Sequence, residues 1–135
     1  MKPLKELYCL SYDSSGFNSG LIAWYNKLID KTYDDLTAAD VSRMIRQDVL
    51  KAVAIKKAIE LFLSDPYDGE YCEGELLEVL ISLDISSVSE LYIERLKNVL
   101  RDVFQDYVKF EWSDDETKNM FGKNIVLMAT KLELM

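Results

Sequence analysis

The chain has 135 residues, of which 49% are hydrophobic and 30% are charged. This composition predicts a globular protein with a core of its own and excludes a chain that is disordered throughout. The formal net charge is −8 and there is no histidine, so the usual general base near neutral pH is missing, as is the basic surface that nucleic acids and anionic membranes require. No apolar run is long enough to cross a bilayer, and the first residues lack the pattern of a signal peptide. We therefore expect a cytoplasmic protein with no catalytic residues, which binds neither nucleic acid nor membrane.

Residues that hold metals and cofactors are sparse. Cys9 and Cys72 form no C-x-x-C pair, and in a reducing compartment we expect two free thiols rather than a disulfide. The acidic residues between positions 65 and 78 lack the spacing of a calcium loop. Without histidine, a di-metal helical bundle lacks its Glu-x-x-His pairs. We expect no metal and no cofactor.

Residues 1–16 carry the weakest pattern in the chain. Their faint alternation fits a short strand, a first helical turn or an irregular arm, and Ser14, Ser15 and Gly16 mark a break. From about Ser19 we expect a helix, because apolar side chains recur there at helical spacing. They are Leu21, Trp24, Tyr25, Leu28 and Ile29.

The next two helices have clearer signals. Thr37 precedes Asp40 by three residues, which predicts a capping box at a helix start. Residues 49–63 follow as the most apolar helix, in which Lys56 and Glu60 are spaced for an i,i+4 ion pair. Because this helix is apolar over more than half of its circumference, we place it at the centre of the fold. Its polar arc consists of Lys56, Lys57, Glu60 and Ser64.

Two further helices are expected in the second half of the chain. The first covers residues 75–83, with Glu75 and Glu78 facing the solvent. The second begins at a serine cap, either Ser86 or Ser87. Its apolar stripe up to residue 110 comprises Tyr92, Leu96, Val99, Leu100, Val103 and Tyr107, widened by Phe104 and Val108.

A last helix opens with the acids of residues 114–116. Negative charge suits the positive end of the helix dipole, which explains these acids without any further role. The patterns together predict an all-α fold, a compact single-domain bundle of five to six helices with short loops over residues 1–135.

The stretch of residues 64–80 stands apart from the helices because of its charge. It leaves a helix at Pro66, turns through Asp68 and Gly69, and contains six acidic residues but no Lys or Arg. Residues 58–94 contain ten acids and no base, so a net charge of −8 leaves +2 for the rest of the chain. A basic partner would be steered towards this segment.

We predict a docking surface there, in which tyrosines alternate with acids as is common at protein interfaces. The alternative is an ordinary solvated helix start, where acids also suit the dipole. The predicted partner-binding residues are Asp65, Tyr67, Asp68, Glu70, Tyr71, Glu73, Glu75 and Glu78.

Residues 33–83 resemble a known family, the helical immunity proteins of bacterial contact-dependent growth inhibition (CDI) systems. The resemblance rests on LTAADVSRMIRQDV, an apolar helix, and then LFLSDPYDGEYCEGELLEVL. Residues 1–32 and 84–135 carry no motif of that family. The matching positions are Leu36, Thr37, Asp40, Ile45, Arg46 and Gln47, then Asp65 and Pro66, then Gly74, Glu75, Leu76 and Leu77.

The resemblance implies a stoichiometric inhibitor. A protein of this kind stays in the cytoplasm and blocks a cognate toxin C-terminal domain, favoured as one monomer in a 1:1 complex. Such toxins are often nucleases, basic around the substrate site, which fits the acidic stretch. Specificity could instead lie in residues 1–32 and 84–135, which would make the acidic loop incidental. Two alternatives remain: an acidic regulatory adaptor or anti-activator for a non-toxin partner, and an enzyme that uses Glu75 and Glu78 as acid and base.

Overall fold

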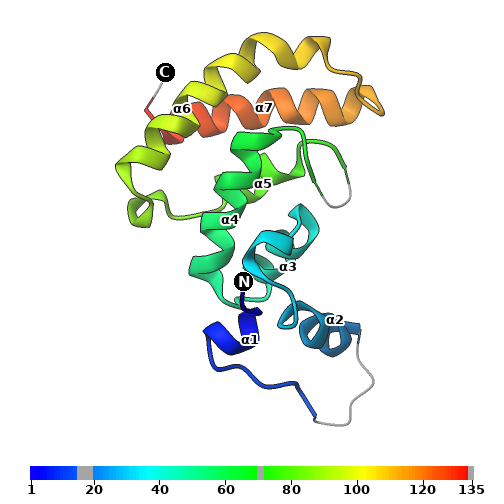
Figure 1. Cartoon of the computed structure of the whole chain (residues 1–135). Coiled ribbons are helices and arrows are strands. Elements are labelled where there is room, and N and C mark those ends of the chain that lie inside the picture. Colours follow the sequence, from blue (N-terminus) through cyan, green and yellow to red (C-terminus); the bar gives the residue numbers. More distant parts are fainter. Residues whose placement is uncertain (15–19, 70–71, 134–135) are drawn as a thin grey trace.

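The computed structural model describes residues 1–14, 20–69 and 72–133 (Figure 1). In these ranges the chain forms seven α-helices and no strand, which confirms the all-α class and slightly exceeds the five to six helices expected. The additional helix is the single turn α1. The helices are α1 Leu4–Leu7, α2 Gly20–Leu28, α3 Ala38–Arg46, α4 Lys51–Ser64, α5 Glu75–Ile81, α6 Glu90–Asp106 and α7 Asp115–Lys131. Short 3-10 helices connect some of them: η1 Tyr33–Asp35, η2 Ile85–Ser87 and η3 Tyr107–Lys109.

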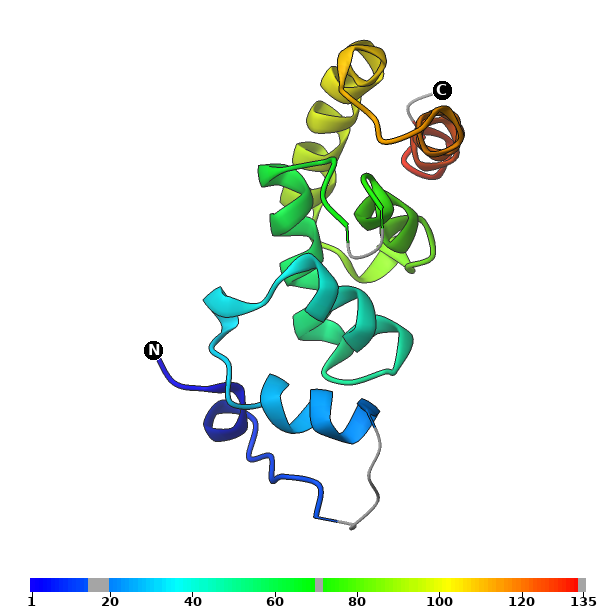
Figure 2. The same ribbon diagram turned by 90° about the vertical axis from the view of Figure 1, so that its right-hand side faces the viewer.

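Helix α4 lies at the centre of the fold, as predicted. Figures 1 and 2 show it between the N-terminal helices α1–α3 and the C-terminal helices α5–α7. It packs against α3, α5 and α6. Ala54, Ala58, Ile59 and Phe62 are at most 2% exposed, which is the burial on several sides that its broad apolar circumference indicated.

The N-terminal residues take the helical alternative. Pro3 starts the turn α1, and Leu4 is fully buried. Backbone hydrogen bonds tie this turn to the end of α2, from the Leu4 amide to the Lys31 carbonyl (2.8 Å) and from the Lys5 amide to the Ile29 carbonyl (2.9 Å). Of the predicted break, Ser14 lies outside any helix or strand, whereas Ser15 and Gly16 lie outside the described residues.

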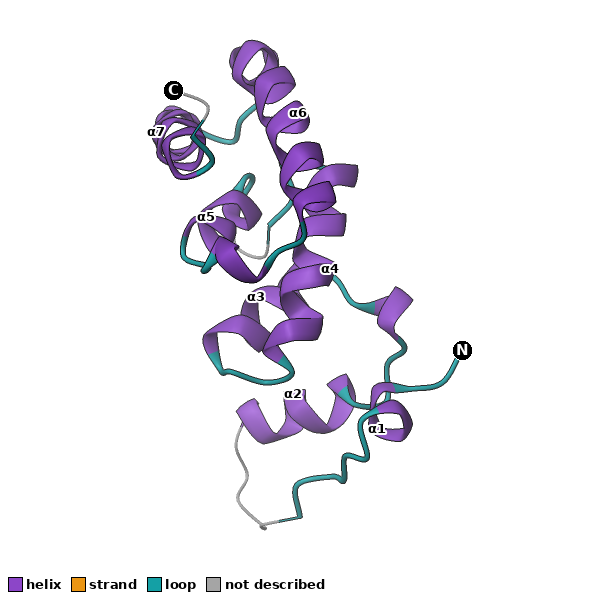
Figure 3. Cartoon of the chain, turned by 90° about the vertical axis from the view of Figure 1, so that its left-hand side faces the viewer, coloured by secondary structure: helices purple, strands orange, loops and turns teal. Residues whose placement is uncertain are grey.

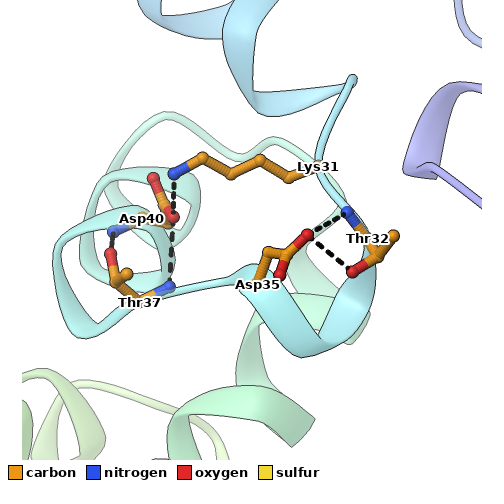
Figure 4. A network of polar contacts seen from close by, with 5 residues as sticks. All are labelled: Lys31, Thr32, Asp35, Thr37 and Asp40. Carbon is orange, nitrogen blue, oxygen red and sulfur yellow. Dashed lines mark hydrogen bonds and ion pairs between the residues drawn. The ribbon is translucent and has the colours of Figure 1, made fainter.

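The capping box of α3 is present as predicted (Figure 4). The Thr37 hydroxyl accepts a hydrogen bond from the Asp40 amide (3.2 Å), and the Asp40 carboxylate accepts one from the Thr37 amide (3.0 Å). Lys31 adds an ion pair to the same carboxylate at 2.7 Å. A second box, formed by Thr32 and Asp35, caps η1 directly before α3. Both caps lie within a few residues in the chain, so local sequence is enough to place them.

The polar arc of α4 is used inside the protein only in part: Lys57 is buried and Glu60 is half-buried, whereas Lys56 and Ser64 are exposed. Glu60 accepts hydrogen bonds from the hydroxyls of Tyr33 (2.7 Å) and Tyr92 (3.1 Å). The expected pair with Lys56 is therefore wrong: the Lys56 Nζ lies over the Tyr33 ring, 5.7 Å from its centre. Lys57 is nearly buried, with its Nζ 4.8 Å from the same ring centre. The reason is tertiary, because η1 and α6 bring both tyrosines to α4.

The long helix α6 starts later than predicted. Ser89, not Ser86 or Ser87, is its N-cap, with the Ser89 hydroxyl accepting from the Tyr92 amide. Asp84 caps the separate turn η2, which uses the two earlier serines. The helix also ends earlier, at Asp106, and the expected edge of its stripe is solvent-exposed: Phe104 is 56% and Val108 52% exposed.

The C-terminal helix α7 lies in the upper half of the molecule in Figure 1. It packs along α5 and α6, and α5 lies between α7 and α4 (Figure 3). Lys131 donates hydrogen bonds to the carbonyls of Ile81 (2.6 Å) and Leu83, so α7 supplies the C-terminal cap of α5. Within the described residues, no helix combines the length and the apolarity that a membrane crossing needs.

Candidate functional site

The acidic stretch is a loop that folds back onto the start of α5. The Gly74 amide donates to the Tyr67 carbonyl (2.6 Å), and the Leu76 amide donates to the Asp68 carbonyl (3.2 Å). Asp65 and Asp68 each accept from a nearby backbone amide, so their carboxylates are held in place locally. The predicted residues Glu70 and Tyr71 lie outside the described residues.

Glycine is required at the point where this loop enters α5. Gly74 has φ +79°, a conformation that residues with a side chain rarely adopt. A Cβ at Gly74 would also lie 2.4 Å from the Phe121 ring. The loop therefore passes directly over α7, and its path depends on that helix.

Tyr67 lies in an aromatic cluster and is not a free anchor. Its ring stacks on Phe110 with 4.2 Å between the ring centres, and it also contacts Trp112 and Phe121 at 5.7 and 5.5 Å. Partial burial raises the pKa of the Tyr67 hydroxyl, with smaller effects from Asp106 and Asp65. This aromatic cluster, formed by Tyr67, Phe110, Trp112 and Phe121, fixes the acidic loop to the segment between α6 and α7.

Glu75 does not face the solvent, which corrects the orientation expected from its helix. It is only 7% exposed, and its carboxylate pairs with the Arg46 guanidinium at 2.6 Å. The acidic stretch has no base in its own sequence, but helix α3 packs against α5 and supplies one. Glu78, one turn further along, is exposed as expected.

Glu73 is bound across the loop to the start of the α7 segment. Both the amide (3.2 Å) and the hydroxyl of Ser113 donate to its carboxylate. The hydrogen bond from the hydroxyl is the main reason why the pKa of Glu73 lies below its usual value. Glu73 is therefore a fixed negative charge at the rim of the loop.

Acidic residues at the start of α7 also lie beside the acidic loop, although the sequence alone explained them only as favourable charges at the positive end of a helix dipole. Asp114 is the N-cap of α7, accepting from the Thr117 amide at 2.7 Å, a hydrogen bond that lowers the pKa of Asp114. Glu116 follows in the first turn, next to the α5 start. The run of three acids at 114–116 was visible in the sequence, but its position beside residues 65–78 depends on how α7 packs.

Two depressions hollow this face. The larger, which we call the acidic cleft, has a volume of about 530 Å³ and lies between the acidic loop and the start of α7. The smaller, the α5–α7 pocket, has about 170 Å³. Neither is lined by Lys or Arg among the described residues. The acidic cleft is lined by Asp65, Tyr67, Asp68, Gly69, Cys72, Glu73, Phe110, Ser113, Asp114 and Thr117.

The two cysteines are free, as predicted, and both are exposed. Although Cys72 is exposed, partial desolvation of its thiol raises the pKa, and four carboxylates raise it further: Glu75, Glu78, Glu73 and Asp114. The described residues contain no group of three or more acidic or cysteine side chains arranged to hold a metal ion. This face is thus negative and partly apolar.

Comparison with known proteins identifies the family. A family model described as CDI immunity proteins matches residues 6–99, well over half of the chain. The chain belongs to this family. As a CDI immunity protein it inhibits a toxin, and the family favours an inhibitor over an enzyme. The match begins within α1 and includes α2 to α5 and the first part of α6, whereas the end of α6 and all of α7 follow it. A search of curated proteins found no match.

Proposed function

We propose that this immunity protein forms a 1:1 complex with its cognate toxin domain in the cytoplasm, and that the toxin is a nuclease. In this proposal the acidic face, which consists of the acidic residues of segments 65–78 and 114–116 around the acidic cleft, covers the toxin's substrate site. The observation that carries it is the gathering of carboxylates from two distant segments, residues 65–78 and 114–116, around an open cleft without Lys or Arg in its lining.

Electrostatic complementarity supports a nuclease as the target. An enzyme that cleaves nucleic acid needs a basic surface to bind phosphates. A negative face competes for that surface, speeds the encounter and selects the orientation of the complex. Because Glu73 and Asp114 have lowered pKa values, their charges persist at neutral pH and somewhat below it.

The proposed contact residues differ in part from the predicted set. Asp65, Asp68, Glu73 and Glu78 remain proposed contacts, and Asp114 joins them. Glu75 acts inside the protein through Arg46. Tyr67 positions the loop through the aromatic cluster, while Glu70 and Tyr71 stay predictions from the sequence alone.

Coexpression tests the function directly. The chain is expressed together with the C-terminal domain of the large exported protein encoded next to it, and growth is recorded. Rescue of growth by this chain, but not by an unrelated acidic helical protein, is the expected result. Loss of the toxin's nuclease activity in a purified 1:1 mixture would extend that result to the proposed target.

The opposite outcome is equally informative. If both proteins are soluble and expressed and growth is not rescued, this toxin is not the partner. Membership of the immunity-protein family rests on the match to residues 6–99 and would stand, so a different toxin would have to be tested.

A further inference from the structure

The α5–α7 pocket has chemistry that a general acidic surface does not need. Its volume of about 170 Å³ is roughly ten times the 10–15 Å³ that one water requires. That space admits one side chain of a partner but not a helix or a strand. Its walls come from the start of α5 and the first half of α7.

Asn124 is the residue that points to a ligand. It lines the pocket although it is 92% buried, since only 8% of its surface is exposed. Within the described residues its side-chain amide makes no hydrogen bond. Among the described residues, Ser42 Oγ is the one side-chain polar atom that is both fully enclosed and without a hydrogen-bond partner. The Asn124 amide also lacks a partner but is not fully enclosed, so it is open to the pocket that it lines. Buried amides normally have partners, and this one is positioned to meet a ligand.

The charge of the pocket restricts that ligand to a cation. Glu73, Glu78 and Glu116 line the pocket together with Glu75, whose carboxylate already pairs with Arg46. Because the described acids are not grouped to hold a metal ion, the cation must be an extended one that reaches separate carboxylates.

The apolar wall distinguishes between the two cationic side chains. Met120, which is 50% exposed, and Phe121, which is 2% exposed, line the pocket beside the acids, so Met120 supplies most of the accessible apolar wall. A guanidinium group is planar, weakly hydrated and carries five N–H donors, so its face can lie against an apolar side chain while its edge donates to several acceptors. A lysine ammonium is a compact, strongly hydrated charge and matches such a wall less well.

We propose that the α5–α7 pocket binds the guanidinium group of one arginine of the toxin. The Asn124 carbonyl oxygen and the carboxylates of Glu78 and Glu116 accept its N–H donors, and the Met120 side chain contacts its planar face. The identity of the partner rests on the proposed function, whereas the preference for arginine rests on the pocket alone.

The pocket also joins two parts of the chain with different relations to the family. Glu73 and Glu78 lie within the matched residues 6–99, whereas Glu116 and Asn124 lie beyond them. Asn124 and Glu116 therefore act as specificity-determining residues, contributed by α7 to a site that the matched region begins.

The experiment uses the full chain and needs no toxin. The ¹⁵N-labelled protein is titrated with N-acetyl-arginine amide and, separately, with N-acetyl-lysine amide at constant ionic strength. The side-chain amide resonances of Asn124 are followed in the parent protein, and the backbone amide resonances of Gly74 and Met120, which also line the pocket, are followed in every variant. We expect a saturable shift with the arginine probe and a weaker one with the lysine probe.

Variants connect the shift to the pocket. Asn124→Leu removes the amide, Glu116→Gln removes one charge, and each should weaken arginine binding by about threefold or more. Glu6→Gln on the exposed side of α1 makes the same charge change at the other end of the molecule and should have no effect. Asn124→Asp keeps the volume of the side chain and should bind arginine more tightly, which covers the case of a leucine variant that does not fold.

Three results would overturn the proposal: no saturable shift at Asn124, equal binding of both probes, or equal weakening by Glu116→Gln and Glu6→Gln. The outcome is independent of the toxin. Growth rescue without arginine binding would contradict the arginine site but leave the proposed function in place. Arginine binding without growth rescue would support the site and contradict the proposed function.

Discussion

At the scale of single residues, Glu75 and Glu78 show how packing separates two side chains that look alike in sequence. Both are glutamates in the first turn of α5. Glu75 is buried against Arg46 of α3, whereas Glu78 is exposed at the edge of the α5–α7 pocket. The first is expected to support the fold, and the second to meet the partner.

Exchanging each of these glutamates for glutamine tests that division. Glu75→Gln removes a charge-assisted hydrogen bond from a buried site, so we expect a loss of about 1–2 kcal/mol in the free energy of unfolding, a modest value because the Arg46 side chain is 42% exposed. Glu78→Gln should change it by no more than about 0.5 kcal/mol. Urea unfolding measures both. Stopped-flow association with the toxin should show the reverse order, and a larger stability loss for Glu78→Gln would contradict the assignment.

Gly74 provides a second test at this scale. Gly74→Ala forces a side chain into a left-handed conformation and against the Phe121 ring, so we expect the protein to lose about 1–3 kcal/mol of stability. Gly20→Ala is the matched control, because a Cβ there meets nothing within 4 Å and alanine is the better helix former. Thermal unfolding of both variants gives the comparison. A Gly74→Ala protein as stable as the control would mean that the loop does not pass over α7 in this way.

At the scale of elements, the loop before α5 is held by the segment that leads into α7. The aromatic cluster and the hydrogen bonds from Ser113 to Glu73 both connect these two parts of the chain. Since α7 also caps the end of α5 through Lys131, one helix orients both ends of α5. The shape of the acidic face is thus a property of α7 as much as of the acidic loop.

A pH titration tests the link between Glu73 and Ser113. Because hydrogen bonds lower the pKa of Glu73 in the folded protein, they stabilise the ionised form. Their contribution to stability is fully present above the unfolded pKa, close to the ordinary value of 4.5, and is lost as the pH falls through the lowered folded pKa.

Ser113→Ala should therefore move the pKa of Glu73 back up, as measured by NMR of its side-chain carboxyl carbon. Its stability deficit relative to the parent protein should be present at pH 7 and shrink in acid. Asp84, whose low pKa arises from Ser86, is the internal control and should titrate as before. An unchanged pKa at Glu73 would show that Ser113 does not hold it.

At the scale of the whole molecule, α4 connects two groups of helices into one core. Buried apolar residues from Leu4 in α1 to Leu132 after α7 belong to a single cluster. This supports the proposal that residues 1–135 fold as one domain. The acidic face lies on the C-terminal group of helices, at a distance from α1 and η1 (Figure 1).

Cooperativity of unfolding tests the single domain. Trp24 in α2 and Trp112 before α7 report on the two groups of helices. Urea unfolding of Trp24→Phe and Trp112→Phe, each followed through the remaining tryptophan and by circular dichroism, should give coincident transitions within each variant. Transitions that separate between fluorescence and circular dichroism would show that the two groups unfold independently.

The charge pattern of the whole molecule predicts the kinetics of toxin binding. Replacing Asp68 and Glu78 by lysine changes the net charge from −8 to −4, and so does replacing Glu6 and Asp34 away from the acidic face. Only the first pair should slow association, by about tenfold or more at low salt, and flatten its salt dependence. Stopped-flow measurements between about 20 and 500 mM salt cover the range in which screening acts, because the Debye length shortens over this range from somewhat less than about 25 Å to a few ångströms. Equal effects of both pairs would assign the steering to net charge alone.

The sequence by itself determined the features that depend on neighbours a few residues apart. The capping box of Thr37 and Asp40 and the periodicity that buries α4 follow from local hydrogen bonding and from helical geometry, so they could be predicted along with the all-α class. The family resemblance rested on the same local signals, and the match to residues 6–99 confirms it. The acidic loop was also visible as a run of like charge.

Only the tertiary structure decided which of these charges are exposed and which are paired inside the protein. Arg46 reaches Glu75 across 29 positions of the chain, and Ser113 reaches Glu73 across 40. Contacts of that length depend on how whole helices pack, because the energy that brings two such residues together comes from burial of the faces of α3, α5 and α7 and not from the pair itself. For that reason Glu75 was expected at the surface and is found in the interior, while the acids of α7 became part of the candidate site.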